Sequence, residues 1–435
     1  MSRHASTVVA AAALAVLAAC ATNPVTGRSE LDLIGEQQEV AMGTAYLNPS
    51  IQESLGPLDD APVQALVQRV GASVAAVGHR PALPYRFVAV NDPAVNAFAL
   101  PGGKICITRG LLSRLGSEDG LAAVLAHEVG HVTARHVVQA YNRQLLAGVV
   151  MIGAGVYAER SDDAYRELAP VAAILGSRLV LACYSREQER QADRLGMDYA
   201  VKAGYSPAGM IETQKILLEL GDRDPGLVER LFASHPMSKE RLGTAEAELA
   251  AMPQDVRSRR VRTEPYRDTL ARVKADRPAW DLAQEGRTLL AANKDAEAEA
   301  RLAKAVSLSP DAGVLHALHS VSLARTGKRA EATAEALAGA RLAPDVFVTR
   351  YLAGQATVRS DPGLALRHLD AAEEILPGQA SVPFLRGTAL EAMGREREAI
   401  EAYRLAVSRD PGGDTGNAAA ARLQALGAAK APSPV

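Results

Sequence analysis

The stretch His127–His131 reads H-E-x-x-H, which has the residue types and the spacing of a metal-dependent hydrolytic site. It follows the apolar run Leu121–Ala126, whose residues favour a helix. A spacing of four places both imidazoles on one helical face, so their ring nitrogens can bind one ion, and zinc suits such ligands. Glu128 is the expected general base, able to take a proton from water. His136, five residues beyond His131, turns off this face in a continuous helix, and we expect it to be structural.

A second, acidic helix offers the third ligand. The chain has Ala134 and Val137 where metzincins have Gly and His, which excludes that class. The helix predicted from about Arg186 to Ala203 instead carries Glu189 and Asp193, four residues apart. Glu189 is the candidate that closes a tetrahedral site, and Asp193 can accept a hydrogen bond from the far nitrogen of a ligand histidine. The alternative is an ordinary solvated helix with surface ion pairs.

H-E-V-G-H at 127–131, followed by S-R-E-Q-E-R-Q-A-D at 185–193, resembles the gluzincin peptidases related to the CAAX prenyl protease. Two further stretches fit the same family, V-N-A-F-A-L-P-G-G at 95–103 and S-H-P-M-S-K-E-R at 234–241. The resemblance implies that Glu189 is the third zinc ligand and that Asp193 is the acid behind the ligands.

Residues 95–108 read as a β-hairpin that turns on Pro101–Gly103. In related peptidases an edge strand beside the metal pairs with the substrate backbone, and Asn96, Ala97 and Phe98 match that strand. The strand pattern alone equally allows a core hairpin in which Phe98 simply packs. The resemblance favours substrate binding.

His235, followed by Pro236, is by its own pattern only a histidine in a turn. The resemblance implies that it can swing into the open fourth position that a catalytic zinc needs. We therefore expect His235 to hold the enzyme latent until a substrate or partner moves its loop. On the same match, Arg241 is expected to help stabilise the developing oxyanion.

The N-terminus predicts export. The apolar run Ala5–Ala19 is too short to span a bilayer, so residues 1–19 are interpreted as a secretory signal peptide. Leu17–Cys20 resembles a bacterial lipobox, which would make Cys20 the lipidated first residue of the mature chain; the alternative is a soluble protein cut nearby. Ala21 resembles the corresponding residue of outer-membrane lipoproteins. The expected location is the periplasm, with acyl chains anchoring the chain to the outer membrane.

Composition narrows the class of protein. Hydrophobic residues make up 48% of the 435 residues but aromatic residues only 4%, which favours a mainly helical, Ala- and Leu-rich protein. Because 48 basic residues balance 50 acidic ones and no basic block occurs, no nucleic-acid partner is expected.

Cys106 and Cys183 are interpreted as buried free thiols, although an oxidising compartment would permit a bridge. The apolar runs 145–156 and 168–183 predict a buried helical hairpin, with a mobile lid over the zinc as the alternative.

The second half of the chain is repetitive. Pro310, Pro344, Pro377 and Pro411 follow one another at intervals of 34, 33 and 34 residues, which is the tetratricopeptide period. Residues 417–426 would form a closing helix. Stacked helical pairs of this kind leave a concave face that suits extended or helical segments of another protein.

The predicted fold is α+β and mainly helical. A zincin-like metalloprotease domain with a small antiparallel sheet (20–252) is followed by a linker (253–277), an all-α tetratricopeptide solenoid (278–428) and a tail (429–435). The predicted function is that of an endopeptidase with one Zn²⁺ per chain. The resemblance implies misassembled outer-membrane or periplasmic proteins as clients and the outer-membrane barrel assembly complex as partner. A non-catalytic scaffold or chaperone is the alternative, whereas an integral-membrane prenyl-protein peptidase is rejected because the mature chain lacks long spanning helices.

Overall fold

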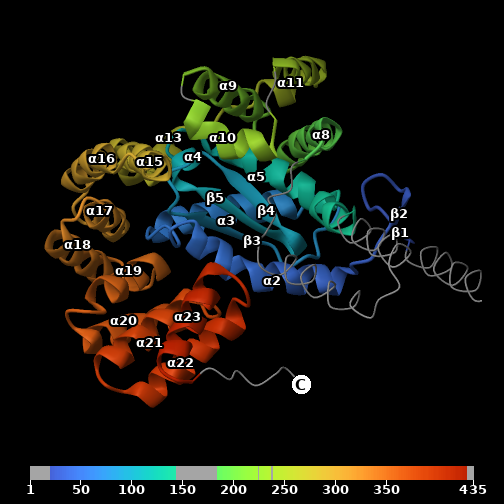
Figure 1. The fold of residues 1–435 in the computed structure, drawn as a ribbon. Coiled ribbons are helices and arrows are strands. Elements are labelled where there is room, and N and C mark those ends of the chain that lie inside the picture. The colour runs from blue at the N-terminus through green and yellow to red at the C-terminus, as the bar shows by residue number, and fades with distance from the viewer. Residues whose placement is uncertain (1–19, 144–183, 224, 237–238, 429–435) are drawn as a thin grey trace, which may run out of the picture. The chain divides into compact units, whose positions relative to one another are not determined.

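The computed structural model describes residues 20–143, 184–223, 225–236 and 239–428 (Figure 1). The predicted signal peptide, the apolar runs 145–156 and 168–183, and the tail lie outside these residues. The chain divides into two compact units: the first comprises Met1–Leu47, Asp60–Ala89 and Ala94–Ala271, and the second Asn48–Asp59, Val90–Pro93 and Arg272–Val435.

Two small sheets belong to the first half of the chain. Their strands are β1 (Cys20–Thr22), β2 (Ser29–Leu31), β3 (Arg86–Val90), β4 (Ala97–Leu100) and β5 (Lys104–Thr108). β1 pairs with β2, and the other three form a sheet in the order β3-β5-β4. β4 and β5 are antiparallel and are joined by the 3-10 turn η1 (Pro101–Gly103), in which Gly102 and Gly103 have φ of 65° and 81°. The predicted hairpin is therefore confirmed, and β4 lies at an edge of its sheet.

Helices make up most of the first unit. They include α2 (Glu36–Glu53), whose residues from Asn48 on belong to the second unit, α3 (Ala61–Ala75), α4 (Arg109–Leu112), α5 (Glu118–Thr133), α8 (Arg186–Lys202), α9 (Ala208–Arg223), α10 (Pro225–Ser234) and α11 (Lys239–Ala251). Figure 1 shows α5 between the three-stranded sheet and the group α8–α11, and α5 contacts α3, α8, α9 and β4. Every residue of α5 is buried, so this helix is the centre of the unit.

Local signals explain where α5 begins and ends. The Ser117 hydroxyl accepts a hydrogen bond from the Gly120 amide at 3.0 Å and caps the N-terminus. After Thr133 the backbone leaves the helix, because Arg135 adopts a left-handed conformation with φ of 59°. The Arg135 guanidinium donates to both carboxylate oxygens of Asp32, at 2.7 and 2.9 Å, and to the Ile34 carbonyl at 2.7 Å. These contacts hold a conformation that costs on the order of 1–3 kcal/mol for a residue other than glycine.

Two glycines let α5 and α8 approach closely. A Cβ added to Gly196 of α8 would lie 2.9 Å from the backbone nitrogen of His127. A Cβ added to Gly130 of α5 would lie 3.0 Å from the Ala192 carbonyl oxygen. Because backbone atoms stand opposite both positions, the helices pack at a separation that larger residues do not permit. α8 begins at Arg186, as predicted, and the structure adds a capping box formed by Ser185 and Gln188.

The segment predicted as a linker carries short helices: α12 (Gln254–Arg257), α13 (Glu264–Thr269) and α14 (Ala271–Ala275). Tyr266 of α13 is fully buried, and its hydroxyl donates to the Leu112 carbonyl at 2.7 Å. This residue therefore belongs to the core of the first unit. Cys106 is a buried free thiol whose pKa burial raises to about 12, as expected of a structural cysteine, while Cys183 lies outside the described residues.

The second unit contains the repeats. Between 277 and 425 the structure has four consecutive helical pairs and a closing helix: α15 (Arg277–Ala291) with α16 (Asp295–Leu308), α17 (Gly313–Arg325) with α18 (Arg329–Leu342), α19 (Phe347–Thr357) with α20 (Pro362–Ile375), α21 (Ser381–Ala392) with α22 (Glu396–Arg409), and α23 (Asp414–Ala425). Small residues let the paired helices interlock; Gly286, for example, faces Leu302. The predicted fold class, α+β and mainly helical with an all-α repeat domain, is confirmed. Among the described helices, none has both the length and the apolar content needed to cross a membrane.

Replacing Gly196 with Ala tests the contact between α5 and α8. The new methyl group meets the His127 backbone, so we expect the free energy of unfolding to fall by about 1–3 kcal/mol in urea titrations. The matched control is Gly243→Ala in α11, where nothing lies within 4 Å of the added Cβ. That change should be neutral or stabilise by up to about 1 kcal/mol, because Ala favours helix. Equal effects of the two substitutions would contradict this packing.

Candidate metal centre

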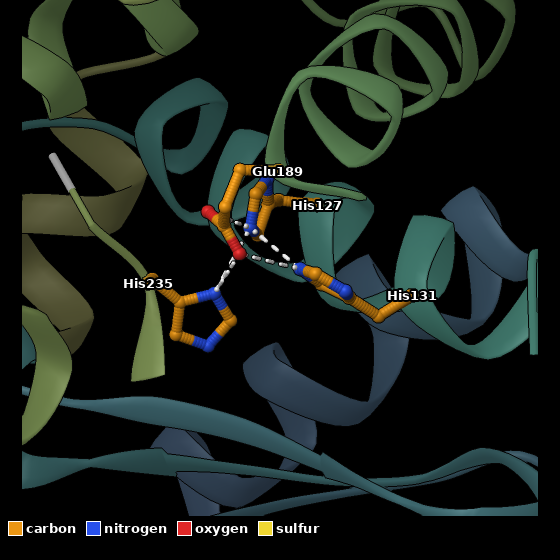
Figure 2. Close-up of side chains that lie close together, drawn as sticks. All are labelled: His127, His131, Glu189 and His235. Atoms are coloured by element: carbon orange, nitrogen blue, oxygen red, sulfur yellow. Dashed lines mark hydrogen bonds and ion pairs between the residues drawn. The ribbon is translucent and has the colours of Figure 1, made fainter. Parts of the chain in front are cut away.

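Four buried side chains from three elements converge on one point. His127 and His131 extend from α5, Glu189 from α8, and His235 from the residue after α10. Figure 2 shows all four pointing toward one another. One ligand atom from each lies within 4.8 Å of the others. The sequence motifs at 127–131 and 185–193, far apart in the chain, therefore meet in the fold.

The separations between these atoms fit a metal ion. Nε2 of His127 lies 3.0 Å from Nε2 of His131 and 3.5 Å from Oε2 of Glu189. Nε2 of His131 lies 3.3 Å from Oε1 of Glu189. For metal–ligand bonds of 2.0–2.1 Å, the edges of a tetrahedron are about 3.3 Å, so the three side chains match a tetrahedral site.

His235 lies at the fourth corner of this arrangement. Its Nδ1 is 3.0 Å from Oε1 of Glu189 and 3.3 Å from Nε2 of His127. On the other side of the ring, Nε2 is 3.7 Å from Oε1 of Glu128. The structure thus places His235 where a fourth ligand would lie, while its movement out of the site stays a prediction.

Asp193 and Arg241 form an ionic network behind the cluster. Oδ1 of Asp193 lies 3.0 Å from Nδ1 of His127, the position predicted for it. Arg241 donates from Nε and Nη2 to the two oxygens of Asp193, both at 2.6 Å, and Nη1 lies 2.7 Å from Oε2 of Glu189. These contacts give Arg241 a positioning role that the sequence did not predict. Its part in stabilising an oxyanion stays a prediction.

The pKa shifts of His131 and Glu189 favour the protonation states that metal ligands need, whereas the pKa of His127 is raised, because its contacts with Asp193 and Glu189 outweigh the lowering effect of burial. Burial lowers the pKa of His131 well below its usual value, so its ring is neutral. Burial alone would raise the pKa of the Glu189 carboxyl, but the surrounding histidines, His235 foremost, lower it well below its usual range. A neutral imidazole and an ionised carboxylate are the forms that bind metals. The pKa of Glu128 is raised, chiefly by burial, which suits a group that must take up a proton.

His136 has a contact that the sequence did not reveal. Its Nδ1 lies 2.9 Å from Nδ1 of His131, and its Nε2 lies 2.9 Å from Oε1 of Gln191. We predicted that His136 turns away from the ligands because we assumed a continuous helix. The left-handed turn at Arg135 ends the helix and brings the ring back to His131. The sequence gives no sign of this left-handed turn, because arginine seldom adopts a positive φ.

A cavity of about 50 Å³ lies beside the cluster. Its lining includes Ala97 of the predicted substrate strand, His127, Glu128 and Gln214. The Gln214 amide is buried, and neither its oxygen nor its nitrogen has a hydrogen-bond partner within the described part of the chain. Asn96, Ala97 and Phe98 are buried, so the structure places this strand next to the site without testing its contact with a substrate.

Comparisons with known proteins agree with these features. Residues 61–249 match peptidase family M48. The β-barrel assembly-enhancing protease of Escherichia coli K12 is 27% identical over 228 residues, which cover 52% of this chain and 46% of that protein. The mitochondrial metalloendopeptidase OMA1 of Schizosaccharomyces pombe is 33% identical over 190 residues, which cover 42% of this chain and 52% of that protein. The chain thus spans about half the length of the curated relatives it matches.

Among solved structures, the TPR protein YrrB is 15% identical, covers 47% of this chain and 96% of its own, and has a TM-score of 0.31. The sequence matches to peptidase family M48 and to the two metallopeptidases confirm the resemblance predicted from the motifs. The H-E-x-x-H helix, Glu189 and His235 all lie within the residues that match the family.

Metal binding should stabilise the native fold. Zn²⁺ at about 100 times its Kd should add about 2.7 kcal/mol to the free energy of unfolding, because it binds the folded chain alone. His131→Ala should abolish this gain, since it removes a ligand. His368→Ala, which removes a histidine from the repeats, should keep it. Urea titrations with Zn²⁺ and with EDTA measure the difference; an undiminished gain in His131→Ala would contradict the site.

Proposed function

We propose that this chain, whose residues 61–249 match peptidase family M48, is a zinc-dependent endopeptidase of the bacterial envelope. The observation that carries the proposal is the convergence of His127, His131 and Glu189 on one point, with Glu128 beside them. When bound there, zinc would lower the pKa of a water molecule and polarise a peptide carbonyl. Two imidazoles and one carboxylate are a donor set common in catalytic zinc sites.

Glu128 is proposed to carry the proton. Its Oε2 has no hydrogen-bond partner among the described residues, and burial raises its pKa. It can therefore accept a proton from the attacking water and return it to the leaving amine. A site with only a structural role needs no such base, which argues against the scaffold alternative.

The substrate is proposed to bind along the edge strand. Among the described strands β4 pairs with β5 alone, so an extended peptide backbone is proposed to pair with the outer side of β4 and to lie along Asn96–Phe98. The neighbouring cavity, with Ala97 and Gln214 in its lining, would receive a substrate side chain. Backbone pairing suits an enzyme that cleaves unfolded proteins of varied sequence.

The clients are proposed to be misassembled outer-membrane or periplasmic proteins. The name of the E. coli relative points to β-barrel assembly, and the repeats offer a surface for a client or for an assembly partner. A lipid anchor in the outer membrane is proposed as the location, on the predicted signal peptide 1–19 and the lipobox-like residues that end at Cys20. Fractionation of cells that carry the native chain or Cys20→Ser would test this location, because only the lipidated protein should stay with the membrane fraction.

The repeats contain a cavity that favours acidic segments. It measures about 770 Å³ and lies among α17, α18 and α19. Arg325, Arg329 and Arg359 are in its lining, and no acidic side chain is among the described residues that line it. Arg325 pairs with Asp295 at 2.8 Å, whereas Arg329 and Arg359 make no ion pair within the described chain. We therefore propose that an acidic, extended segment of a client or partner binds here.

Glu128→Gln should abolish proteolysis without loss of the metal. Removing a positioned general base costs about 10²- to 10⁴-fold in rate, while the metal ligands stay unchanged. The assay is cleavage of unfolded casein by the zinc-loaded chain, with zinc content measured in parallel. Cleavage at the native rate would refute the proposed role of Glu128.

His235→Ala tests the latch. Because His235 lies at the fourth corner of the site, its removal should speed casein cleavage severalfold while zinc stays bound. Cleavage that is unchanged or slower than in the native chain would rule out the latch. The double variant with Glu128→Gln should be inactive, which controls for a contaminating protease.

The double substitution Arg329→Glu and Arg359→Glu should weaken binding of an acidic peptide to the repeats about tenfold or more, because it reverses both unpaired charges. A peptide of the same length with Gln for Glu should bind weakly to both forms. Fluorescence anisotropy on the full chain measures the affinities. Equal affinity of the native chain for both peptides would contradict the charge preference.

A further inference from the structure

Three polar side chains form a chain of hydrogen bonds that ends at a metal ligand. Oε1 of Gln191 lies 2.9 Å from Nε2 of His136, and Nδ1 of His136 lies 2.9 Å from Nδ1 of His131. His131 is fully buried and His136 is 1% exposed, so neither ring can exchange these partners for bulk water. The chain joins α8, which carries Gln191, to the end of α5.

The chemistry of the groups fixes the direction of each hydrogen bond. A side-chain carbonyl oxygen only accepts, so the Gln191 contact requires His136 to donate from Nε2. A neutral imidazole that donates from Nε2 has its lone pair on Nδ1. His131 must then donate from its own Nδ1, which leaves the lone pair of its Nε2 directed at the cluster.

We propose that Gln191 and His136 act as a positioning relay that holds His131 in the tautomer able to bind the metal. The relay differs from the one behind His127, where the carboxylate of Asp193 accepts from Nδ1 at 3.0 Å. His127 is therefore oriented by the carboxylate of Asp193, whereas His131 is oriented by the neutral side chains of His136 and Gln191. A neutral relay adds no further negative charge to a site that already holds the carboxylates of Glu189 and Asp193.

The surrounding structure holds the relay in place. The Tyr184 ring stacks on His131, with centroids 3.8 Å apart and an angle of 23° between the planes, which restricts rotation of the ligand ring. Arg135, held by Asp32, keeps the left-handed turn that presents His136. A residue that only filled space would need neither a left-handed turn nor two hydrogen bonds of 2.9 Å.

Zinc affinity of the full chain tests the relay, which rests on the proposed metal site. His136→Ala removes the acceptor, so zinc should bind about 10- to 100-fold more weakly, as is usual when a partner of a ligand is lost. His136→Asn should stay within about threefold of the native affinity, because its Oδ1 can accept where Nδ1 does. Gln191→Leu, which frees the His136 tautomer, should also weaken binding, and His368→Ala is the control for loss of a histidine elsewhere.

Competition with a chromophoric chelator gives the affinities, and urea titration of the metal-free variants shows whether each one folds. Nitrogen-15 NMR of the zinc-loaded native chain gives a readout that a space-filling role would not move: His136 should carry its proton on Nε2. A proton on Nδ1 of His136 overturns the relay, as does native affinity in a folded His136→Ala chain. If the native chain binds no zinc, the proposed function fails as well; if it binds zinc and His136→Ala binds equally, the relay alone fails.

Discussion

The close packing of α5 against α8 is the contact on which the candidate metal centre depends. Two ligands come from α5 and one from α8, so the distance between the helices sets the distance between ligand atoms. Gly130 and Gly196 make this distance possible, because backbone atoms of the opposite helix stand where their Cβ atoms would be. Well-packed interiors resist displacement, and a shift of even one ångström would spread the ligands beyond one ion.

Burial of so many ionisable groups has an electrostatic cost that the contacts around the site offset. Glu189 is fully buried, and a carboxylate in that environment must be paired and hydrogen-bonded to remain charged. Arg241 supplies one positive charge to both Glu189 and Asp193, and the histidines supply the remaining partners. The cluster is therefore a network in which each side chain orients the next. A bound cation would add a further stabilising charge.

The repeats of the second unit offer a binding surface that is separate from the candidate metal centre. A peptidase that pairs with the substrate backbone gains little selectivity from that contact, since all unfolded chains offer the same main-chain groups. Helical repeats supply a separate surface with its own charge and shape. On the proposed binding of acidic segments, the cavity that contains Arg329 and Arg359 would give this surface a charge preference.

Much of the architecture follows from the sequence. The spacing of four in H-E-x-x-H and in Glu189–Asp193 reflects one turn of helix, and the proline period of 33–34 reflects one repeat, so both can be recognised without coordinates. The helix predicted to begin at about Arg186 does begin there, because its start depends on nearby residues. The candidate ligands on α5 and α8 were predicted from the sequence motifs that contain them.

Only the tertiary structure decided the remaining contacts. His136 returns to His131 because Arg135 is held at positive φ by Asp32, about one hundred positions earlier in the chain. Arg241 pairs with Asp193 and Glu189 because α8 and α11 pack together, and the cavity beside Glu128 exists because α5, α9 and β4 meet. Sequence patterns record local periodicity, whereas these contacts join residues whose separation in the chain says nothing of their distance in space.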